Sequence, residues 1–352
     1  MNMHKQRGLS LIELLVALGI GSFLIIGAVT VQSQTRKTFT VNEQQARLQE
    51  TARFVLSVIE PDVQLAGLMG YSNNTTAVNL MVGTEPVSSK YMRTTAGAIT
   101  GVPAVMNSCG NNYVFDVTTP IRVDNGTWTL GCGAQGGGFV TTTDTLTVRR
   151  TGVEKATPTA GRIQLYTHRL SANNQKLFWN GTAPGPLVAN ISEVRDLIMQ
   201  AYYVSRDSDG RPGLPSLRLK QITATAGAGA WDDQEIVRGV EDMQIEIGVD
   251  TGLDTMNDGT PDDADGDGMV DFVNGDVSRY VQPGDAILSN AQVVALRVWV
   301  RVRAEELEPG FKDTRTYKYG STNFTASDGY RRVVMSRTIF IRNARSFPSS
   351  AS

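Results

Sequence analysis

The sequence has little of the chemistry that most enzymes use. Its 352 residues contain two histidines and two cysteines, and one histidine, His4, lies in the first few residues. The chain has no serine-hydrolase elbow, no zinc-protease helix motif and no phosphate-binding glycine loop. We therefore expect that the protein is not an enzyme. We interpret His168 as an ordinary histidine at the end of a predicted strand.

Charge is scarce near the start of the chain. Lys5 and Arg7 come first, a single acid, Glu13, follows, and no charged residue occurs from Leu14 to Thr35. Such a run approaches the roughly 20 residues of a transmembrane helix. A cleaved secretory signal is the alternative, although its apolar run is shorter and ends in a small-residue cleavage site. An acid inside a membrane needs a partner, and a nearby amine suits it best.

The net charge of −2 gives no general attraction to nucleic acid. Acidic residues gather between Asp250 and Asp285, and basic residues gather after Leu296. The basic residues that precede the apolar run predict that the amino terminus stays in the cytoplasm. We therefore expect the bulk of the chain to be periplasmic or further out.

The two cysteines, Cys109 and Cys132, suit an oxidising compartment, where an even pair usually forms a disulfide. A pair of free buried thiols and a pair of metal ligands are the alternatives. The sequence around them offers a metal no further cysteine or histidine. We predict a Cys109–Cys132 disulfide.

The apolar run is predicted to continue as a long helix. Leu48, Ala52, Val55 and Ile59 recur at helical spacing and mark one apolar face, which Phe54, Leu56 and Val58 would widen. Pro61 predicts an end near Ile59, because a proline disfavours helix at the residue before it. Two helices with a joint near residues 32–37 are the alternative.

From Tyr71 onward, short runs with strand character alternate with turn residues. In residues 242–249 and 293–303, apolar and polar side chains alternate, as in antiparallel strands with one buried and one wet face. We expect the amphipathic helix to cover the buried face. The strands expected are 113–117, 145–149, 162–167, 198–205, 242–249, 293–303 and 333–342.

Three arginines share a predicted strand face with Trp299, namely Arg297, Arg301 and Arg303. Arginines beside an aromatic ring can contact a nucleic-acid backbone and stack on bases. A solvated strand face, or a contact with an acidic neighbouring subunit, is the interpretation that the low net charge favours. No nucleic acid is expected as a partner.

The segment D-D-A-D-G-D-G-M-V-D, residues 262–271, has the spacing of a calcium loop. Hard oxygen ligands at these positions favour Ca²⁺ in a structural role, and Asp258 or Asp276 would complete the set. Position 12 is Asn274 instead of glutamate, so an EF-hand is not expected. An acidic surface loop without an ion is the alternative. The predicted ligands are Asp263, Asp265, Asp267, Met269 and Asp271.

The string G-L-S-L-I-E-L-L-V-A-L, residues 8–18, resembles the class III leader of type IV pilins. The resemblance implies that a prepilin peptidase cuts between Gly8 and Leu9 and methylates the new amino terminus. It also implies that Glu13 pairs with the methylated amine of a neighbouring subunit. Pilins of this family usually begin with phenylalanine, and Leu9 departs from that pattern.

Further segments are similar to PilW-type minor pilins. They are residues 61–67, 240–245, 329–334 and 341–343. The resemblance implies an α+β, type IV pilin-like fold, in which a long helix packs on an antiparallel β-sheet of an enlarged β-rich head. The expected parts are a leader (1–8), a transmembrane and filament-core helix (9–35), an amphipathic half of the helix (36–65) and a periplasmic or extracellular head (66–352).

The same resemblance implies a minor pilin that primes pilus assembly or caps the pilus tip. Its partners would be other minor pilins, the major pilin, the prepilin peptidase and the inner membrane, and a surface receptor is possible. The protein would lie in the inner membrane before assembly and on the pilus afterwards. A calcium-dependent adhesin on a pilin-like stem and a large type II secretion pseudopilin are the alternatives.

Overall fold

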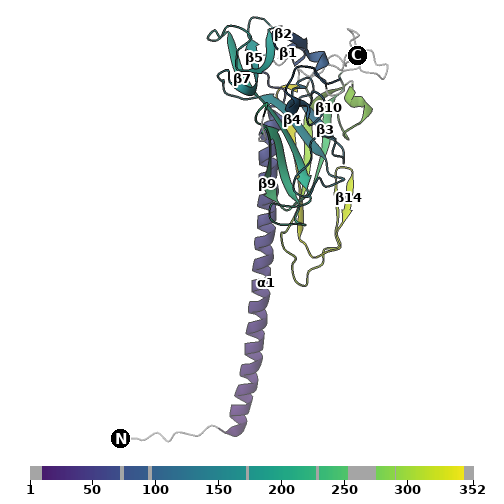
Figure 1. Cartoon of the computed structure of the whole chain (residues 1–352). Coiled ribbons are helices and arrows are strands. Elements are labelled where there is room, and N and C mark those ends of the chain that lie inside the picture. The colour runs from purple at the N-terminus through teal and green to yellow at the C-terminus, as the bar shows by residue number, and fades with distance from the viewer. Residues whose placement is uncertain are drawn as a thin grey trace, which may run out of the picture. The chain divides into compact units, whose positions relative to one another are not determined.

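The computed structural model describes residues 10–71, 75–93, 97–171, 174–226, 230–252, 275–289 and 291–344. The chain divides into two compact units, Met1–Leu48 and Gln49–Ser352. Helix α1, Leu11–Gln64, begins in the first unit and ends in the second (Figure 1). The leader residues Gly8 and Leu9 lie outside the described residues, and so do the predicted calcium ligands.

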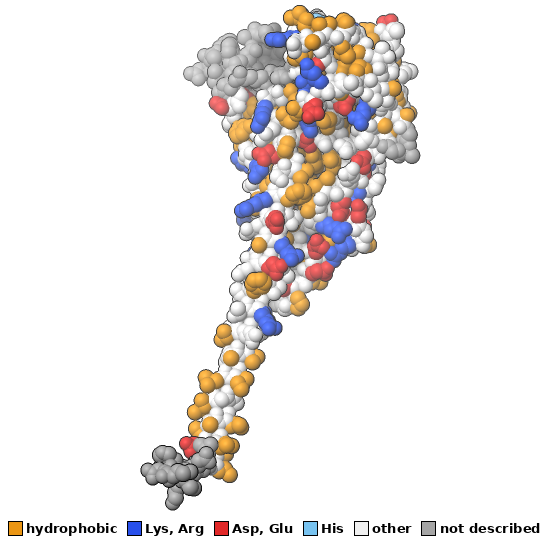
Figure 2. All heavy atoms as spheres, turned by 90° about the vertical axis from the view of Figure 1, so that its left-hand side faces the viewer, with side chains coloured by type: hydrophobic (Ala, Val, Ile, Leu, Met, Phe, Trp, Pro, Cys, Tyr) orange, Lys and Arg blue, Asp and Glu red, His pale blue; other side chains and the backbone are white. Residues whose placement is uncertain are grey.

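In its described residues, the first unit is the exposed part of α1, which is apolar up to Val31 and polar after it. Side chains such as Leu11, Phe23 and Val31 are each more than 60% exposed, and Figure 2 shows hydrophobic side chains around this part of the helix. Because α1 is continuous, the alternative with a joint near residues 32–37 is wrong. An apolar surface that no protein covers requires lipid or another subunit around it.

The helix also extends beyond the end that Pro61 predicts. It ends at Gln64, with Pro61 inside its last turn. A proline removes one backbone N–H, which matters least near a helix end, and the Pro61 carbonyl still accepts a hydrogen bond from the Leu65 N–H at 3.1 Å. The prediction of an end near Ile59 was therefore wrong by about one turn.

In the second unit, α1 buries the face that its periodicity predicts. Ala52, Val55 and Ile59 are buried, and Leu56 and Val63 extend this face. Phe54 is 47% exposed, so its predicted place on the buried face was wrong. Val58 is half-buried. Burial of these five aliphatic side chains contributes several kcal/mol at about 25 cal/mol per Å² of apolar surface.

A nine-stranded sheet forms one part of the head (Figure 1). Its strands follow the order β2-β1-β6-β5-β7-β4-β3, and β8 and β9 extend it from β7. The long β7 makes this branching possible, since its first half pairs with β5 and its second half with β8. The strands are β1 Val78–Val82, β2 Glu85–Ser88, β3 Ile121–Asp124, β4 Thr145–Thr151, β5 Ala160–His168, β6 Gln175–Asn180, β7 Ser192–Ser205, β8 Ser216–Ile222 and β9 Trp231–Arg238.

A four-stranded antiparallel sheet has the order β11-β10-β12-β15, and β13 and β14 form a separate hairpin. These strands are β10 Val240–Asp250, β11 Arg279–Val281, β12 Gln292–Arg303, β13 Thr316–Tyr319, β14 Thr322–Thr325 and β15 Arg332–Phe340. Four short 3-10 helices complete the described chain, η1 Thr75–Ala77, η2 Ser89–Tyr91, η3 Ala104–Asn107 and η4 Ala286–Ser289.

The α+β fold is confirmed, with two corrections. The pairing of β1 with β6 is parallel, whereas the prediction was an antiparallel sheet. Residues 113–117 form no strand and are a buried turn. The fully buried Arg149 of β4 donates to the carbonyls of Tyr113 and Thr119 at 2.6–2.8 Å. These carbonyls therefore need no strand partner.

Part of the polar face of the four-stranded sheet is buried, whereas the prediction was a wet face. Asp242 and Gln244 of β10 are only 4% and 6% exposed. Gln244 donates to the Thr142 carbonyl at 2.7 Å, and the guanidinium of Arg301 lies 3.6 Å from the Phe324 ring centre of β14. The β13–β14 hairpin and the loop before β4 therefore cover this part of the face. The alternation marked two chemically different faces, and the polar one is buried at Asp242, Gln244 and Arg301 but exposed at Ser336, Thr338 and Phe340 of β15.

Candidate functional site

The described features with a bearing on function are the apolar part of α1, the attachment of its last turn to the sheets, and a charged network over the four-stranded sheet. Helix α1 contains an 18-residue window with a mean hydropathy of 2.5. It is therefore long and apolar enough to cross a membrane. Glu13 lies in its first turn and is exposed, and its N–H donates to Ser10 Oγ at 3.2 Å. An acid at this position interacts favourably with the helix dipole.

The last turn of α1 is attached to β4 and β7 by Asp62. Its carboxylate accepts hydrogen bonds from Arg150 Nε at 3.0 Å and Nη2 at 2.6 Å, and from the Tyr202 hydroxyl. The Gln200 amide also donates to it once its oxygen and nitrogen are exchanged. Burial raises the pKa of Tyr202, and the Asp62 charge raises it further, so this hydroxyl remains a donor.

Two further contacts attach the same turn to β15 and the residues after it. Glu60 forms an ion pair with Arg337 of β15, and the Gln64 carbonyl accepts from the Arg342 N–H at 3.0 Å. Asn343 donates to the Ala66 carbonyl at 3.3 Å. The helix end is therefore fixed to both sheets by directional bonds as well as by apolar contact.

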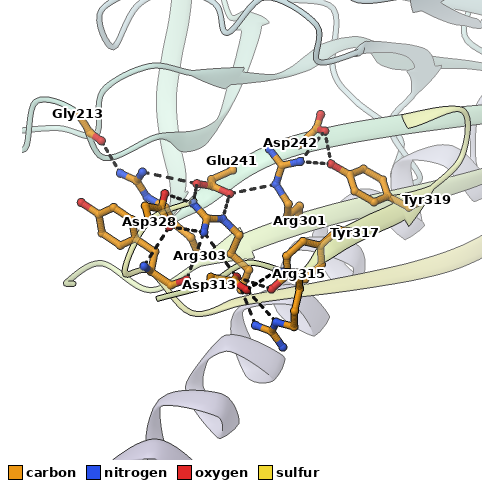
Figure 3. A network of polar contacts seen from close by, with 12 residues as sticks. Gly213, Glu241, Asp242, Arg301, Arg303, Asp313, Arg315, Tyr317, Tyr319 and Asp328 are labelled. Carbon is orange, nitrogen blue, oxygen red and sulfur yellow. Dashed lines mark hydrogen bonds and ion pairs between the residues drawn. The ribbon is translucent and has the colours of Figure 1, made fainter. Parts of the chain in front are cut away.

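A network of buried charges holds the β12–β15 connection against the four-stranded sheet (Figure 3). Glu241 of β10 accepts from Arg301 Nε at 3.0 Å and from Arg332 Nε at 2.7 Å, and Arg303 lies 3.5 Å from it. Arg332 also binds Asp328 at 2.6 Å. The expectation that Arg301 and Arg303 lie on a solvated face or meet an acidic neighbour was therefore wrong.

Asp313 and Asp242 form the two ends of this network. Although burial opposes it, hydrogen bonds from Arg315 and Tyr317 lower the pKa of Asp313 to about 2. Burial raises the pKa of Asp242, whose carboxylate accepts from the Tyr319 hydroxyl. Each acid thus has a donor from the β12–β15 connection, as Figure 3 shows.

The predicted disulfide is confirmed, since Cys109 and Cys132 are bonded, with their Cα atoms 4.4 Å apart. Cys109 lies in the buried cluster that packs residues 104–117 against β1, β5, β6 and β7. The indole N–H of Trp128 donates to the Cys132 carbonyl at 2.9 Å. The bridge therefore fixes a long segment without regular secondary structure to the sheet core.

The structure describes both ends of the connection that carries the predicted calcium ligands. Asp250, at the end of β10, accepts from the Gly252 N–H at 2.9 Å and from the Gly275 N–H at 2.7 Å. One buried carboxylate thus brings these two glycines together. Within the described ranges, no three histidine, cysteine, aspartate or glutamate side chains are grouped so that they could hold a metal.

The sequence interpretation missed Asp62, Glu241 and their arginine partners. One signal was present, because several arginines lie in strands whose other residues are uncharged, such as Arg149 and Arg150 of β4. Charged residues in such strands are rarely buried without a partner. The signal does not name that partner, because Asp62 and Arg150 lie 88 residues apart in the sequence. His168 ends β5, as predicted.

A membrane-length apolar helix, whose last turns pack on a β-rich head, defines a pilin-like protein. Comparison with known families agrees with this class. The Prokaryotic N-terminal methylation motif matches residues 3–29, and Type IV Pilus-assembly protein W matches residues 201–343. Over these residues, the chain is similar to PilW-type pilins.

The second match spans β10, β12 and β15 and most of the charged network, and covers less than half of the chain. It includes the resembling segments 240–245, 329–334 and 341–343, whereas residues 61–67 lie outside it. No curated protein and no solved structure matches the chain significantly. The matched families describe pilus assembly and amino-terminal methylation, and neither is an enzyme family.

Proposed function

We propose that this protein is a minor pilin that primes assembly of a type IV pilus or caps its tip. The observation that carries the proposal is the combination of a leader motif, an uncovered apolar helix and a PilW-type head in one chain. A prepilin peptidase would cut after Gly8, and the helix would remain in the inner membrane, with the head in the periplasm, until assembly. It would then dock beside the helices of other minor pilins and the major pilin.

Glu13 would fix the axial position of this docking. A carboxylate in a medium of low dielectric pairs strongly with an ammonium group, here the amino terminus of a neighbouring subunit. The large size of the second unit, Gln49–Ser352, supports a sparse subunit or a cap, because a repeating subunit must leave room for its copies.

The test is Glu13→Gln in the full chain, in cells that build the pilus. We expect mass spectrometry to find the mature terminus at Leu9, methylated as before, and immunoblots of sheared pili to contain at least about tenfold less of the chain. Glu43→Gln is the matched control, because Glu43 is an exposed acid of α1 beyond the apolar run. Deletion of the gene should reduce the number of pili, and normal pilus number would refute the priming role.

We also propose that residues 263–271 bind a structural Ca²⁺. The support is the spacing of Asp263, Asp265, Asp267, Met269 and Asp271, since oxygen ligands at these positions are those that Ca²⁺ takes. The test is calorimetric titration of the chelator-treated chain with Ca²⁺. We expect one binding event, which Asp265→Asn with Asp267→Asn should abolish and Glu306→Gln should not change.

The alternative function, a calcium-dependent adhesin, would require the same Ca²⁺ ion. If the protein binds a surface receptor through Ca²⁺, preformed pili should lose surface attachment when a chelator is added while pilus number stays constant. If it acts in assembly, its deletion should change pilus number more than the binding of preformed pili. The two measurements therefore separate an adhesin from an assembly factor.

A further inference from the structure

Strand β15 is the outer strand of the four-stranded sheet, and its outer edge is open. It pairs with β12 over its whole length, from Arg332 opposite Arg303 to Phe340 opposite Ala295, without a break in register. In the described part of the chain, no strand pairs with its other side. Ser336, Thr338 and Phe340 are exposed, and Phe340 is 58% exposed.

The register tells which backbone groups face outward. The Ile341 N–H bonds to the Val294 carbonyl, and the Ala304 N–H bonds to the Arg331 carbonyl. The odd-numbered residues of β15 therefore bond to β12, and the even-numbered ones point their N–H and C=O groups to the open edge. The Arg342 N–H confirms this parity, because it bonds outward to the Gln64 carbonyl at the end of α1. Val334, Ser336, Thr338 and Phe340 thus direct their backbone N–H and C=O groups to this edge, where no strand of the described chain bonds to them.

The other outer strands of the described sheets carry features that discourage strand addition. β2 has four residues, including Glu85 and Pro86, and β11 has three residues. β3 has four residues, two of them charged. β9 carries Asp232, Asp233 and Glu235, and its pairing with β8 contains a register shift. Short length, charge, proline and bulges are the usual protections of an edge.

β15 has none of these protections between Val333 and Phe340, apart from Arg337. That arginine points to the α1 side of the sheet, where Glu60 neutralises it. Phe340 adds an exposed aromatic ring at the end of the row. A nine-residue edge of this kind is a template for an incoming strand.

We propose that an extended segment of a neighbouring pilus subunit adds to β15 as a fifth strand of this sheet. The segment forms backbone hydrogen bonds with Val334, Ser336, Thr338 and Phe340, and places an apolar side chain against Phe340. Since Glu60 already pairs with Arg337, the segment needs no acid for charge balance. The identity of the partner as a pilus subunit rests on the proposed function, whereas the open edge does not.

The first experiment maps the partner in the full chain, in cells that build the pilus. A photoreactive benzoyl-phenylalanine in place of Phe340 keeps the aromatic character of this position. We expect a cross-linked adduct in sheared pili, whose linked peptide belongs to another pilus subunit. An adduct only with a second copy of the chain, or no adduct although the chain is present in the pili, overturns the proposal.

A pair of variants at Ser336 tests the backbone bonds. Ser336→Pro, combined with the Phe340 probe, removes an outward N–H that β12 does not use, and a proline is tolerated at such an edge position. Ser336→Ala is the matched control, because it changes the side chain and keeps the N–H. We expect the proline to reduce the adduct about tenfold and the alanine to change it less than about twofold. Equal adducts in both variants contradict strand addition.

A third measurement needs no variant. In residue-resolved hydrogen exchange, the amides of Arg337 and Ile339 should be protected both in the free chain in detergent and in pili. The amides of Ser336 and Thr338 should exchange fast in the free chain and at least about tenfold more slowly in pili. Fast exchange in both states refutes the edge proposal. Absence of the chain from pili that form in normal number refutes the proposed function instead.

Discussion

The carboxylate of Asp62, in the last turn of α1, lies 2.6 Å from the guanidinium of Arg150 in β4. The two side chains are 8% and 13% exposed, so the pair is largely shielded from water. The pair therefore gives the last turn of α1 a fixed attachment to the nine-stranded sheet. The Asp62 carboxylate accepts hydrogen bonds from three side chains, those of Arg150, Tyr202 and Gln200.

We expect Asp62→Asn to lower the free energy of unfolding by about 3 kcal/mol, because it leaves a largely buried Arg150 charge without its partner. Chemical unfolding of the full chain in detergent measures this. Glu306→Gln is the control, since the Glu306 side chain is 76% exposed in its pair with Arg211. It should cost less than about 1 kcal/mol. A loss for Asp62→Asn no larger than that of the control would contradict the attachment role.

We expect Glu241→Gln to loosen the β12–β15 connection, residues 304–331. Three arginines share the Glu241 carboxylate, and Arg332 has a side chain only 1% exposed. Loss of the shared acid should cost at least about 3 kcal/mol and open this connection to protease. Limited proteolysis with mapping of the cut sites measures the effect. Cuts in this connection at the wild-type rate would show that the network does not hold it.

We expect the stability difference between Asp144→Asn and the wild type to depend on pH. Burial raises the pKa of Asp144 to about 7, even though the Ile245 and Gly126 N–H groups donate to its carboxylate. Between about pH 4 and pH 7, the folded chain therefore keeps the Asp144 proton, whereas the unfolded chain, with an ordinary aspartate pKa near 4, has released it. The contribution of Asp144 to the free energy of unfolding is complete below about pH 4 and is lost as the pH rises to about 7.

The asparagine variant keeps a neutral side chain and avoids this loss. Relative to the wild type, it should gain stability between pH 4 and pH 7, by an amount on the order of 4 kcal/mol, and the difference should stay constant above pH 8. Urea unfolding at several pH values measures it. Two stability curves that remain parallel across this range would show that Asp144 titrates normally.

We expect reduction of the Cys109–Cys132 bond to lower the free energy of unfolding by about 3 kcal/mol, in the chain-entropy model. The sequence separation is 23 residues, and the segment between the cysteines has little regular structure to replace the constraint. The urea midpoint of the wild type should fall when a reductant is added. A double Cys109→Ala, Cys132→Ala variant should have the lower midpoint and no response to reductant. If the reductant also lowered the urea midpoint of the variant, the fall in the wild type would be an effect of the reductant and not of the broken disulfide.

The features that depend on local order could be predicted from the amino-acid sequence alone. The uncharged run after Glu13 predicts a membrane-length helix, because the membrane requires consecutive apolar residues. The spacing from Leu48 to Ile59 predicts the buried face of α1, and alternation predicts β10 and β12, because both patterns repeat along a single element. The leader motif and the disulfide could be predicted as well, since a motif is contiguous and two cysteines leave one possible pair.

Contacts between residues far apart in the sequence became known from the folded structure. Neither local pattern nor composition could place Asp62 beside Arg150, make β1 and β6 parallel, or cover the polar face of β10 with the β13–β14 hairpin. The same holds for the open edge of β15, which is free only because no other strand of the described chain lies there. Pairing between segments far apart depends on how all elements pack together, and this information is spread over the whole chain.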